Sequence, residues 1–316
     1  MDQSSVKKDK KDYPVVSVVV PAFNHEHYIA DCISSILEQD YPNIDLIVIN
    51  DGSTDHTGEK IKETLKKNPS RFVYIAKENE GLIKTLNLGL QLARGKYFCE
   101  LASDDMFLPS SITNRVHYLE GHSDIDVVFA DAYRIDNNTR TKIKLSEGGK
   151  RYNSLEHTIT DLIQGKAKIM FPTGMFRKAI LERLGGFDED FRYSEDVTIW
   201  YQLALHAKIG YFDRPVIYYR KHSDNTSSSL PFKYGIRKEK ILALEKLFSL
   251  NIKDLENVVK KYLYREYIKF IKFSLQNPVD EQELRDVFRK ATGMYPHAVK
   301  IRYYMMWSII KGYLRE

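Results

Sequence analysis

Residues 16–24 read VSVVVPAFN, and residues 44–53 read IDLIVINDGS. Each stretch begins with a run of β-branched and aliphatic residues and ends in small or polar residues. Strands that are apolar on both faces and separated by helices are typical of a parallel sheet that is covered on both sides. These two stretches therefore predict an α/β fold, and the first half of the chain repeats the same pattern.

The periodicity of apolar residues predicts the remaining elements. We expect strands at Val16–Val20, Leu46–Ile49, Phe72–Ile75, Tyr97–Leu101, Val127–Ala130, Ile209–Phe212 and Val216–Tyr219. We expect helices near His27–Glu38, Thr57–Lys67, Leu82–Ala93, Pro109–Leu119 and Asp196–His206. From Phe232 the pattern is helical to the end, with breaks near Asn277–Pro278 and around Gly293 and Pro296. The predicted organisation is a solvated tail at 1–14, an α/β domain at 15–231 and a helical extension at 232–316.

The bulk properties are those of a globular protein. A chain of 316 residues has room for one large domain and an appendage. Two cysteines, Cys32 and Cys99, form no disulfide framework and favour a reducing compartment. The start of the chain lacks the apolar core of a secretory signal, and no apolar stretch approaches the roughly 18 residues of a spanning helix. We therefore expect a cytoplasmic protein, either soluble or peripheral on the cytoplasmic face of the membrane.

The basic residues are concentrated in the helical extension. From Lys233 to Glu316 there are 18 Lys and Arg residues against 10 Asp and Glu residues. One helical stretch carries Lys261, Arg265, Lys269 and Lys272 on one face, with Val259, Leu263, Tyr267 and Phe270 broadly opposite. The surplus fits a solvated helical surface, and it equally fits an anionic partner such as a membrane face or a lipid-phosphate acceptor. The apolar face fits packing against the α/β domain or burial in a membrane interface.

Polar or acidic residues follow three of the predicted strands. Pro21–Asn24 follow the first strand, Asn50–Ser53 the second and Ala102–Asp105 the fourth. In parallel sheets ligands bind beyond the carboxyl ends of the strands, where these loops gather. We therefore expect the three elements to meet at one edge of the sheet.

Two adjacent aspartates are the strongest candidates for a metal site. Asp104 and Asp105 follow a buried strand, and paired carboxylates suit a hard divalent cation. The alternative is that an aspartate at this point only caps the next helix. Asp51 lies in a turn, and a turn alone explains the glycine and serine that follow it. A turn does not explain why a carboxylate stands at the edge of the sheet, where a ligand could be bound. Lys84, near a helix start, fits either a phosphate contact or a solvated helix face.

These residues, taken in order, resemble the inverting family-2 glycosyltransferases of the GT-A fold. The matching elements are Val16–Asn24, Val48–Asp55, Asn79–Gly81, Leu86–Gly89, Ser103–Asp105, Gly185–Asp188, Ser194–Asp196 and Tyr219–His222. The likeness runs from about Val16 to Ser229. Each motif is weak alone, but their order and spacing together are specific.

The resemblance implies a fold, a reaction and a set of site residues. The fold would be a GT-A nucleotide-diphospho-sugar transferase fold with a mostly parallel sheet and a C-terminal helical extension. A sugar would pass from a nucleotide-diphosphate donor to a hydroxyl of a glycan or lipid-linked glycan, with inversion, in cell-surface polysaccharide or O-antigen biosynthesis. The residues implied in donor binding are Pro21, Ala22, Phe23, Asn24, Asp51, Gly52, Ser53, Lys84 and Asp104, of which Asp104 lies near the ribose. Those implied in binding Mn²⁺ or Mg²⁺ are Asp105, Asp104 and His222, while Asp196 would be the general base and Glu195 would position the acceptor.

The sequence departs from the family pattern at two places. Many relatives have a further aspartate two residues before Asp104, where this chain has Ala102, so the division of roles between Asp104 and Asp105 is open. Where relatives often have an arginine, this chain has Leu86, which leaves Lys84 as the phosphate contact. His25 and His27 flank Glu26, but their spacing fits no closed zinc site, and we interpret both as loop histidines.

Two other functions share some of these features. A nucleotidyltransferase also joins an α/β sheet to metal-binding carboxylates, and an inactive protein would bind a sugar nucleotide without turnover. No groove-reading motif accompanies the basic surplus, so the sequence does not indicate nucleic-acid binding.

Overall fold

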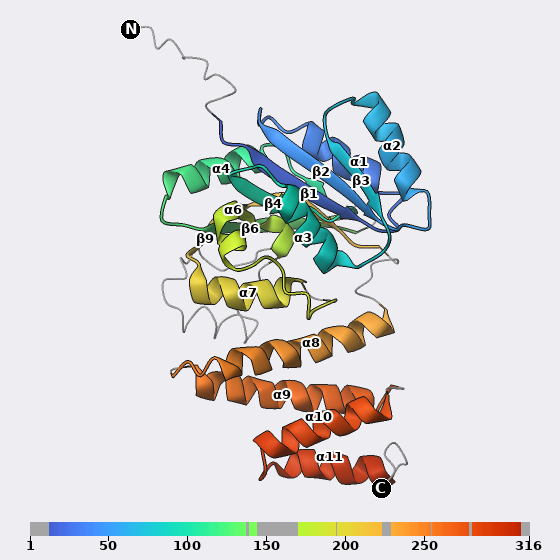
Figure 1. Ribbon diagram of the computed structural model, residues 1–316, viewed down its shortest axis with the longest axis vertical. Helices are drawn as coiled ribbons and strands as arrows, with labels where there is room; N and C mark the ends of the chain where they lie inside the picture. Colours follow the sequence, from blue (N-terminus) through green and yellow to red (C-terminus); the bar gives the residue numbers. More distant parts are fainter. Residues whose placement is uncertain are drawn as a thin grey trace. The chain divides into compact units, whose positions relative to one another are not determined.

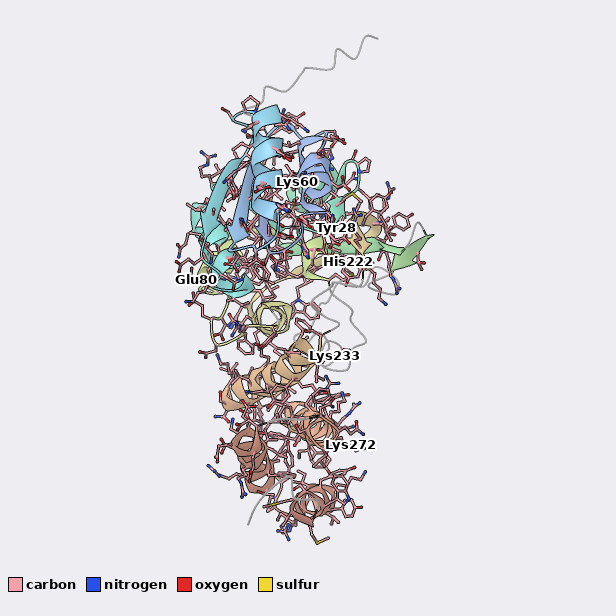
Figure 2. All side chains as sticks on the ribbon, turned by 90° about the vertical axis from the view of Figure 1, so that its right-hand side faces the viewer. Tyr28, Lys60, Glu80, His222, Lys233 and Lys272 are labelled. Atoms are coloured by element: carbon pink, nitrogen blue, oxygen red, sulfur yellow. The ribbon has the colours of Figure 1, made fainter. Side chains whose placement is uncertain are left out.

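The computed structural model describes residues 13–136, 139–143, 170–193, 195–222, 229–253, 255–277 and 280–310. Most of the expected tail at 1–14 and the expected break at Pro278 lie outside these residues. The chain divides into two compact units, Met1–Ser223 and Asp224–Glu316 (Figure 1). Figure 2 shows the side chains of both units.

The described part of the first unit contains one sheet of nine strands. In spatial order they are β3 (Val73–Lys77), β2 (Ile44–Asp51), β1 (Val16–Ala22), β4 (Tyr97–Glu100), β8 (Met175–Arg177), β6 (Val127–Asp136), β9 (Ile209–Arg220) and β5 (Met106–Phe107), and β7 (Thr139–Ile143) pairs with β6. Strands β3, β2, β1 and β4 are parallel, with Val18 opposite both Leu46 and Cys99. Strand β8 pairs antiparallel with β4 and β6, while β6 and β9 are parallel. The predicted α/β fold with a mostly parallel sheet is confirmed.

Helices cover both faces of this sheet because the strands are apolar on both. Val16, Val18 and Val20 of β1 belong to one apolar cluster, and Val19 belongs to the other. The first cluster includes side chains of α1 (Ile29–Leu37), α2 (Thr57–Lys67) and α4 (Ser111–Gly121). The second includes side chains of α3 (Leu82–Leu92), α6 (Lys178–Arg183) and α7 (Glu195–His206). The sheet is therefore the middle of three layers.

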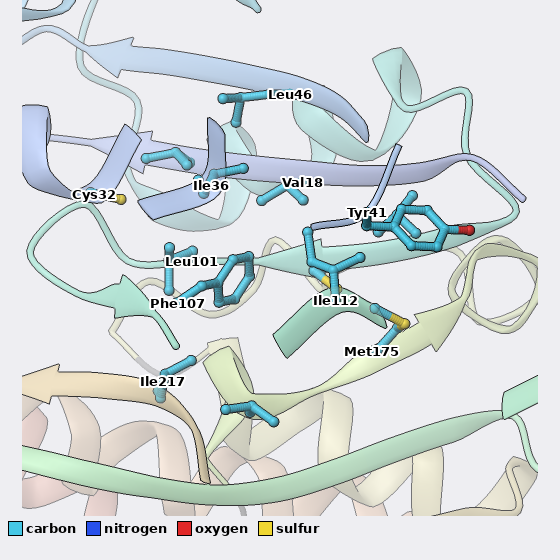
Figure 3. Packing of buried hydrophobic residues seen from close by; sticks show 14 of the residues in the cluster. Val18, Cys32, Ile36, Tyr41, Leu46, Leu101, Phe107, Ile112, Met175 and Ile217 are labelled. Carbon is cyan, nitrogen blue, oxygen red and sulfur yellow. The ribbon is translucent and has the colours of Figure 1, made fainter. Parts of the chain in front are cut away.

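Figure 3 shows the first cluster, to which Ile36 of α1, Ile112 of α4, Val18 and Leu101 belong. These four side chains are fully buried. Burying an aliphatic side chain of this size stabilises a fold by about 1.5–3 kcal/mol. The core therefore fixes the strands whose carboxyl ends carry the candidate site.

Three features of the sheet differ from the expectations. The short strands β5, β7 and β8 are not predicted by any apolar run. Residues 209–220 form one strand, β9, where two are expected. The pairing of β9 with β6 shifts register around Asp131, opposite Pro215, and this irregularity accommodates the polar Asp213–Pro215 segment within a continuous strand.

The second unit is a set of four described helices, namely α8 (Leu230–Ser249), α9 (Glu256–Ser274), α10 (Glu281–Met294) and α11 (Val299–Ile310). The break between α8 and α9 is not predicted; there Asn251 takes a positive φ of 51°.

The apolar face of α9 is buried, and it includes Val259, Leu263 and Phe270. Helix α9 packs against α8, α10 and α11 within this unit. No described helix has the length and apolar character to cross a membrane.

Candidate active site

The loops after β1 and β2 are joined to each other by hydrogen bonds. The backbone nitrogen of Asn24 donates to Ser53 Oγ at 3.0 Å, and that of Thr54 donates to Asn24 Oδ1 at 2.8 Å. Farther along, the Glu26 amide donates to Asp55 Oδ2 at 3.0 Å, and the amide of His56 donates to Glu26 Oε2 at 2.9 Å. The structure thus brings two of the three expected sheet-edge elements together.

Asp51, the last residue of β2, ties this edge to the start of α3. Its buried carboxylate accepts hydrogen bonds from Lys77 Nζ at 2.5 Å and from the amides of Glu80 at 3.0 Å and Gly81 at 2.9 Å. Amides at a helix start favour a negative charge. Asp51 therefore organises the turn before α3, and Lys77 is a partner that the sequence does not predict.

Gly52 is required by the same turn. Its φ is +70°, and a Cβ at this position would lie 2.5 Å from the backbone nitrogen of Asn79. The Asn79 side chain donates in turn to the Asp51 carbonyl at 3.0 Å. The two predicted motifs, Asn50–Ser53 and Asn79–Gly81, are consequently packed against each other.

The other predicted donor-binding residues lie around this turn. Ala22 is buried at the end of β1, Pro21 is half-buried, and Phe23 is 44% exposed, so an aromatic residue is accessible at the sheet edge. Lys84 lies on an exposed face of α3, with Nζ 3.4 Å from Glu80 Oε1. Glu80 also pairs with Lys77, so Lys84 is linked to Asp51 through a chain of charges and not directly.

The third element, after β4, meets a segment from much later in the chain. Asp104 Oδ2 lies 3.0 Å from His222 Nε2 and 4.0 Å from His25 Nε2. The ligand atoms of these three residues all lie within 4.8 Å of one another. His222 follows β9 and His25 follows β1. The structure therefore brings Asp104 and His222 together, as the sequence predicts, and adds His25, which does lie in a loop but reaches the cluster.

Asp105 occupies a different position from Asp104. Its Oδ1 accepts a hydrogen bond from the Arg220 amide at 2.8 Å, and its Oδ2 is buried with no hydrogen-bond partner among the described residues. Burial, and after it the neighbouring Asp104 carboxylate, raises the pKa of Asp105 well above its usual range. Asp104, and not Asp105, belongs to the group of three side chains whose ligand atoms lie close together.

Arg220 and Tyr28 support the cluster, and the sequence pattern predicts neither role. Arg220 Nε donates to the Asp104 carbonyl at 3.0 Å, and the guanidinium lies 4.9 Å from the centre of the Tyr28 ring. The Tyr28 and His222 rings lie side by side with centroids 4.5 Å apart (Figure 2). Arg220 belongs to the stretch Tyr219–His222 that resembles the family pattern, but only the fold reveals its contacts.

Glu195 and Asp196 are the first two residues of α7. Their side chains, and Ser194 before them, lie outside the described residues. The structure therefore gives the position of these two residues in the fold and leaves their contacts as a prediction.

The clustered groups fit a divalent cation. One carboxylate and two imidazoles are common ligands of first-row transition ions, and the donor atoms are close enough to share one ion. Asp105 Oδ2 is buried without a hydrogen-bond partner among the described residues, and the raised pKa of that carboxyl shows that its charged form is poorly stabilised by the protein alone. A cation at this edge would also neutralise a phosphate group.

Comparison with known proteins gives consistent matches. Residues 17–185 match the family model Glycosyl transferase family 2. Uncharacterized glycosyltransferase RP339 of Rickettsia prowazekii is 31% identical over 224 residues, which cover 68% of this chain and 67% of the relative. An uncharacterized glycosyltransferase of Haemophilus influenzae is 28% identical over 296 residues, covering 83% and 88%.

Two solved structures share the fold. S. aureus TarS 1–349 in complex with UDP-GlcNAc has a TM-score of 0.67 at 20% identity, with 95% of this chain and 89% of the TarS chain covered. Mannosyltransferase PcManGT from Pyrobaculum calidifontis, in complex with GDP-Man and Mn²⁺, has a TM-score of 0.56 at 15% identity, covering 98% and 87%. At these identities the likeness shows the fold alone.

Proposed function

The chain belongs to glycosyl transferase family 2 and is a glycosyltransferase, and from this premise we propose that it moves a sugar from a nucleotide-diphosphate donor to an acceptor hydroxyl with inversion. The observation that carries the proposal is the cluster of Asp104 and His222 at the sheet edge that also holds Asp51. Family membership removes the nucleotidyltransferase alternative.

The donor nucleotide is proposed to lie over the carboxyl ends of β1 and β2. Pro21, Ala22, Phe23 and Asn24 line one side, with Asp51, Gly52 and Ser53 on the other, and Asp104 lies near the ribose. Lys84 is proposed to reach the phosphates from the first turn of α3. TarS with UDP-GlcNAc and PcManGT with GDP-Man support a nucleotide-sugar donor, while leaving the base and the sugar open.

A divalent ion, Mn²⁺ or Mg²⁺, is proposed to be held by Asp104 and His222, with Asp105 next to them. When bound, the ion neutralises the negative charge that develops on the departing diphosphate. The chain prepares this site by holding Asp104 through Arg220 and by packing Tyr28 against His222. The support is the donor set of the cluster and the Mn²⁺ named with PcManGT.

The reaction is proposed to be a direct displacement. The acceptor oxygen attacks the anomeric carbon, the bond from that carbon to the diphosphate oxygen breaks, and the nucleoside diphosphate leaves with the electron pair. The hydroxyl proton passes to Asp196, and Glu195 positions the acceptor. A positioned base is typically worth about 10²–10⁴ in rate. The support is the place of both residues at the start of α7 and the family pattern.

We propose bacterial cell-surface polysaccharide or O-antigen assembly as the setting, on the cytoplasmic face of the membrane, with a glycan or lipid-linked glycan as acceptor. Helix α11 offers the membrane contact. It exposes Val299, Tyr303, Met305 and Met306, and its neighbouring Lys300 and Arg302 are exposed as well. Residues 299, 303 and 306 share one helix face. Apolar side chains flanked by cations suit an anionic lipid surface.

One assay tests the proposed reaction. The full chain is incubated with a panel of nucleotide sugars and Mn²⁺, with and without candidate glycan acceptors, and the release of nucleoside diphosphate is measured. We expect one donor to be consumed, and the anomeric configuration of the product to be opposite to that of the donor. A product with retained configuration would contradict inversion. No release from any donor would instead support an inactive sugar-nucleotide-binding protein.

A further inference from the structure

One histidine in the loop after β1 is held in the metal cluster, and its neighbour is not. The side chain of His25 is 18% exposed, whereas that of His27 is 75% exposed. The His25 ring lies edge-on to that of His222, with centroids 5.8 Å apart. His27 Nε2 lies beside Glu26 at 3.5 Å and belongs to no such cluster among the described residues.

The second nitrogen of the His25 ring has a partner that suits a metal ligand. Its Nδ1 lies 2.7 Å from Ser103 Oγ, and Ser103 is buried. A proton on Nδ1, donated to this oxygen, leaves the lone pair on Nε2, the atom 4.0 Å from Asp104 Oδ2. Metal-bound histidines usually have such a hydrogen bond on the other ring nitrogen, which fixes the ring and the tautomer.

The loop backbone is also fixed. The His25 amide donates to Thr57 Oγ1 at 2.8 Å, and Thr57 is the fully buried first residue of α2. His25 is therefore anchored at its backbone and at Nδ1, which leaves Nε2 facing the Asp104 carboxylate.

The distances suit one shared ion. Ligands about 2.0–2.2 Å from an ion lie about 3 Å apart when adjacent and about 4.3 Å apart when opposite. The observed 3.0 Å between Asp104 and His222 and 4.0 Å between Asp104 and His25 fall within these limits. The largest separation between two ligand atoms in the cluster is at most 4.8 Å. A movement of about half an ångström brings this separation to the value of about 4.3 Å for opposite ligands.

We propose that His25 is a metal ligand that completes a set of two histidines and one carboxylate with Asp104 and His222, and that this set selects Mn²⁺ over Mg²⁺. Mg²⁺ prefers oxygen ligands in near-ideal octahedral geometry, whereas imidazole suits first-row transition ions. A site with Asp104 and His222 alone offers one nitrogen ligand, and His25 doubles that number. The inference deepens the proposed metal site and rests on the proposed function for the role of the ion.

The test measures metal binding without turnover. The full chain is made metal-free with a chelator and titrated with Mn²⁺, with free Mn²⁺ followed by electron paramagnetic resonance, and Mg²⁺ affinity is obtained by competition. For His25→Ala we expect at least about a tenfold loss of Mn²⁺ affinity and a smaller change for Mg²⁺. The matched control His27→Ala should bind both ions as the unmodified chain does.

Two further variants keep the test informative if His25→Ala folds poorly. His25→Asp replaces the nitrogen with oxygen and should restore binding while shifting the preference towards Mg²⁺. Ser103→Ala should weaken Mn²⁺ binding less than His25→Ala does. Nitrogen couplings in the pulsed spectrum of bound Mn²⁺ should indicate two imidazoles in the unmodified chain and one in His25→Asp.

Unchanged Mn²⁺ affinity and an unchanged Mn²⁺ to Mg²⁺ ratio in both His25 variants would overturn the inference, as would a spectrum with one imidazole in the unmodified chain. That result leaves the proposed function standing if Asp104→Ala still abolishes Mn²⁺ binding. Sugar transfer that needs no metal would count against the proposed metal site, whereas the absence of transfer from any donor would count against the proposed function itself.

Discussion

His222 Nε2 lies 3.0 Å from Asp104 Oδ2, although 118 positions separate the two residues in the sequence. Asp104 lies in the loop that follows β4, and His222 lies two residues after β9, the strand that pairs with β5 just beyond Asp105. The Arg220 amide, which donates to Asp105 Oδ1, fixes how these segments approach. The short strand β5 thus brings the last motif of the domain to the carboxylates.

Gly52→Ala should destabilise the first unit. The substitution places a Cβ in a left-handed backbone and against the Asn79 backbone, so we expect a loss of about 2 kcal/mol or more in the free energy of unfolding. Urea denaturation followed by Trp200 fluorescence, in a Trp307→Phe background, reports on this unit. The control Gly121→Ala meets nothing within 4 Å and should be neutral or slightly stabilising. Equal effects of the two substitutions would contradict the packing described for the turn.

Asp45→Asn should reveal a pH-dependent contribution to stability. Desolvation acts to raise the pKa of this carboxyl, but hydrogen bonds from Arg94 and Ser17 outweigh it, so the pKa is lowered in the folded chain. The contribution is therefore present above the ordinary aspartate value of about 3.9 and is lost as the pH falls through the lower folded value.

At pH 7 we expect the substitution to cost about 1.5–3 kcal/mol in the free energy of unfolding. The difference from the unmodified chain should shrink below pH 4, measured with the same Trp200 reporter. Asp124→Asn, at an exposed aspartate, serves as control. A difference that does not change with pH would show that Asp45 contributes through its shape and not its charge.

Asp196→Asn should remove transfer and preserve donor binding. The amide has nearly the same volume but does not take the acceptor proton, so we expect kcat to fall by about 10²–10⁴ with the donor dissociation constant changed less than about twofold. Asp213→Asn, at an exposed position of β9, is the matched control. Turnover that survives in Asp196→Asn would refute the assigned base.

Met306→Asp should weaken binding to anionic vesicles. The charge lies on the exposed face of α11 and would oppose both insertion and the attraction to phosphatidylglycerol. We expect a several-fold loss in cosedimentation at low salt, against little change for Leu250→Asp, an exposed apolar position between α8 and α9. If the unmodified full chain does not sediment with these vesicles at low salt, the membrane proposal fails.

The sheet and its polar edge could be predicted because each depends on local pattern. Apolar runs predict β1, β2 and β4, and the residues after them converge because the strands are parallel and adjacent. Strands β5 and β8, with two and three residues, have too few residues to show a period. They form because neighbouring strands offer open hydrogen-bonding edges.

The site was predictable only in part, for the same reason. Asp51 and Asp104 stand at strand ends, which a pattern reveals, whereas the partners Lys77, Arg220 and His25 are determined by which loops meet across the sheet. His25 looks like His27 in sequence, and only the adjacency of β1 and β4 brings it to Ser103. Similarly, periodicity predicts that one face of α9 is buried, but not that α8, α10 and α11 cover it.

Donor binding measured by calorimetry with and without metal, in the unmodified chain and in Asp104→Ala, tests the proposed site most directly. UDP-GlcNAc and GDP-Man are suitable first ligands, followed by other nucleotide sugars. We predict that one donor binds, that removing Mn²⁺ weakens its affinity by at least about tenfold, or 1.4 kcal/mol, and that Asp104→Ala abolishes this metal dependence. Donor affinity that is the same in chelator, in Mn²⁺ and in Asp104→Ala would contradict a metal-assisted site at Asp104.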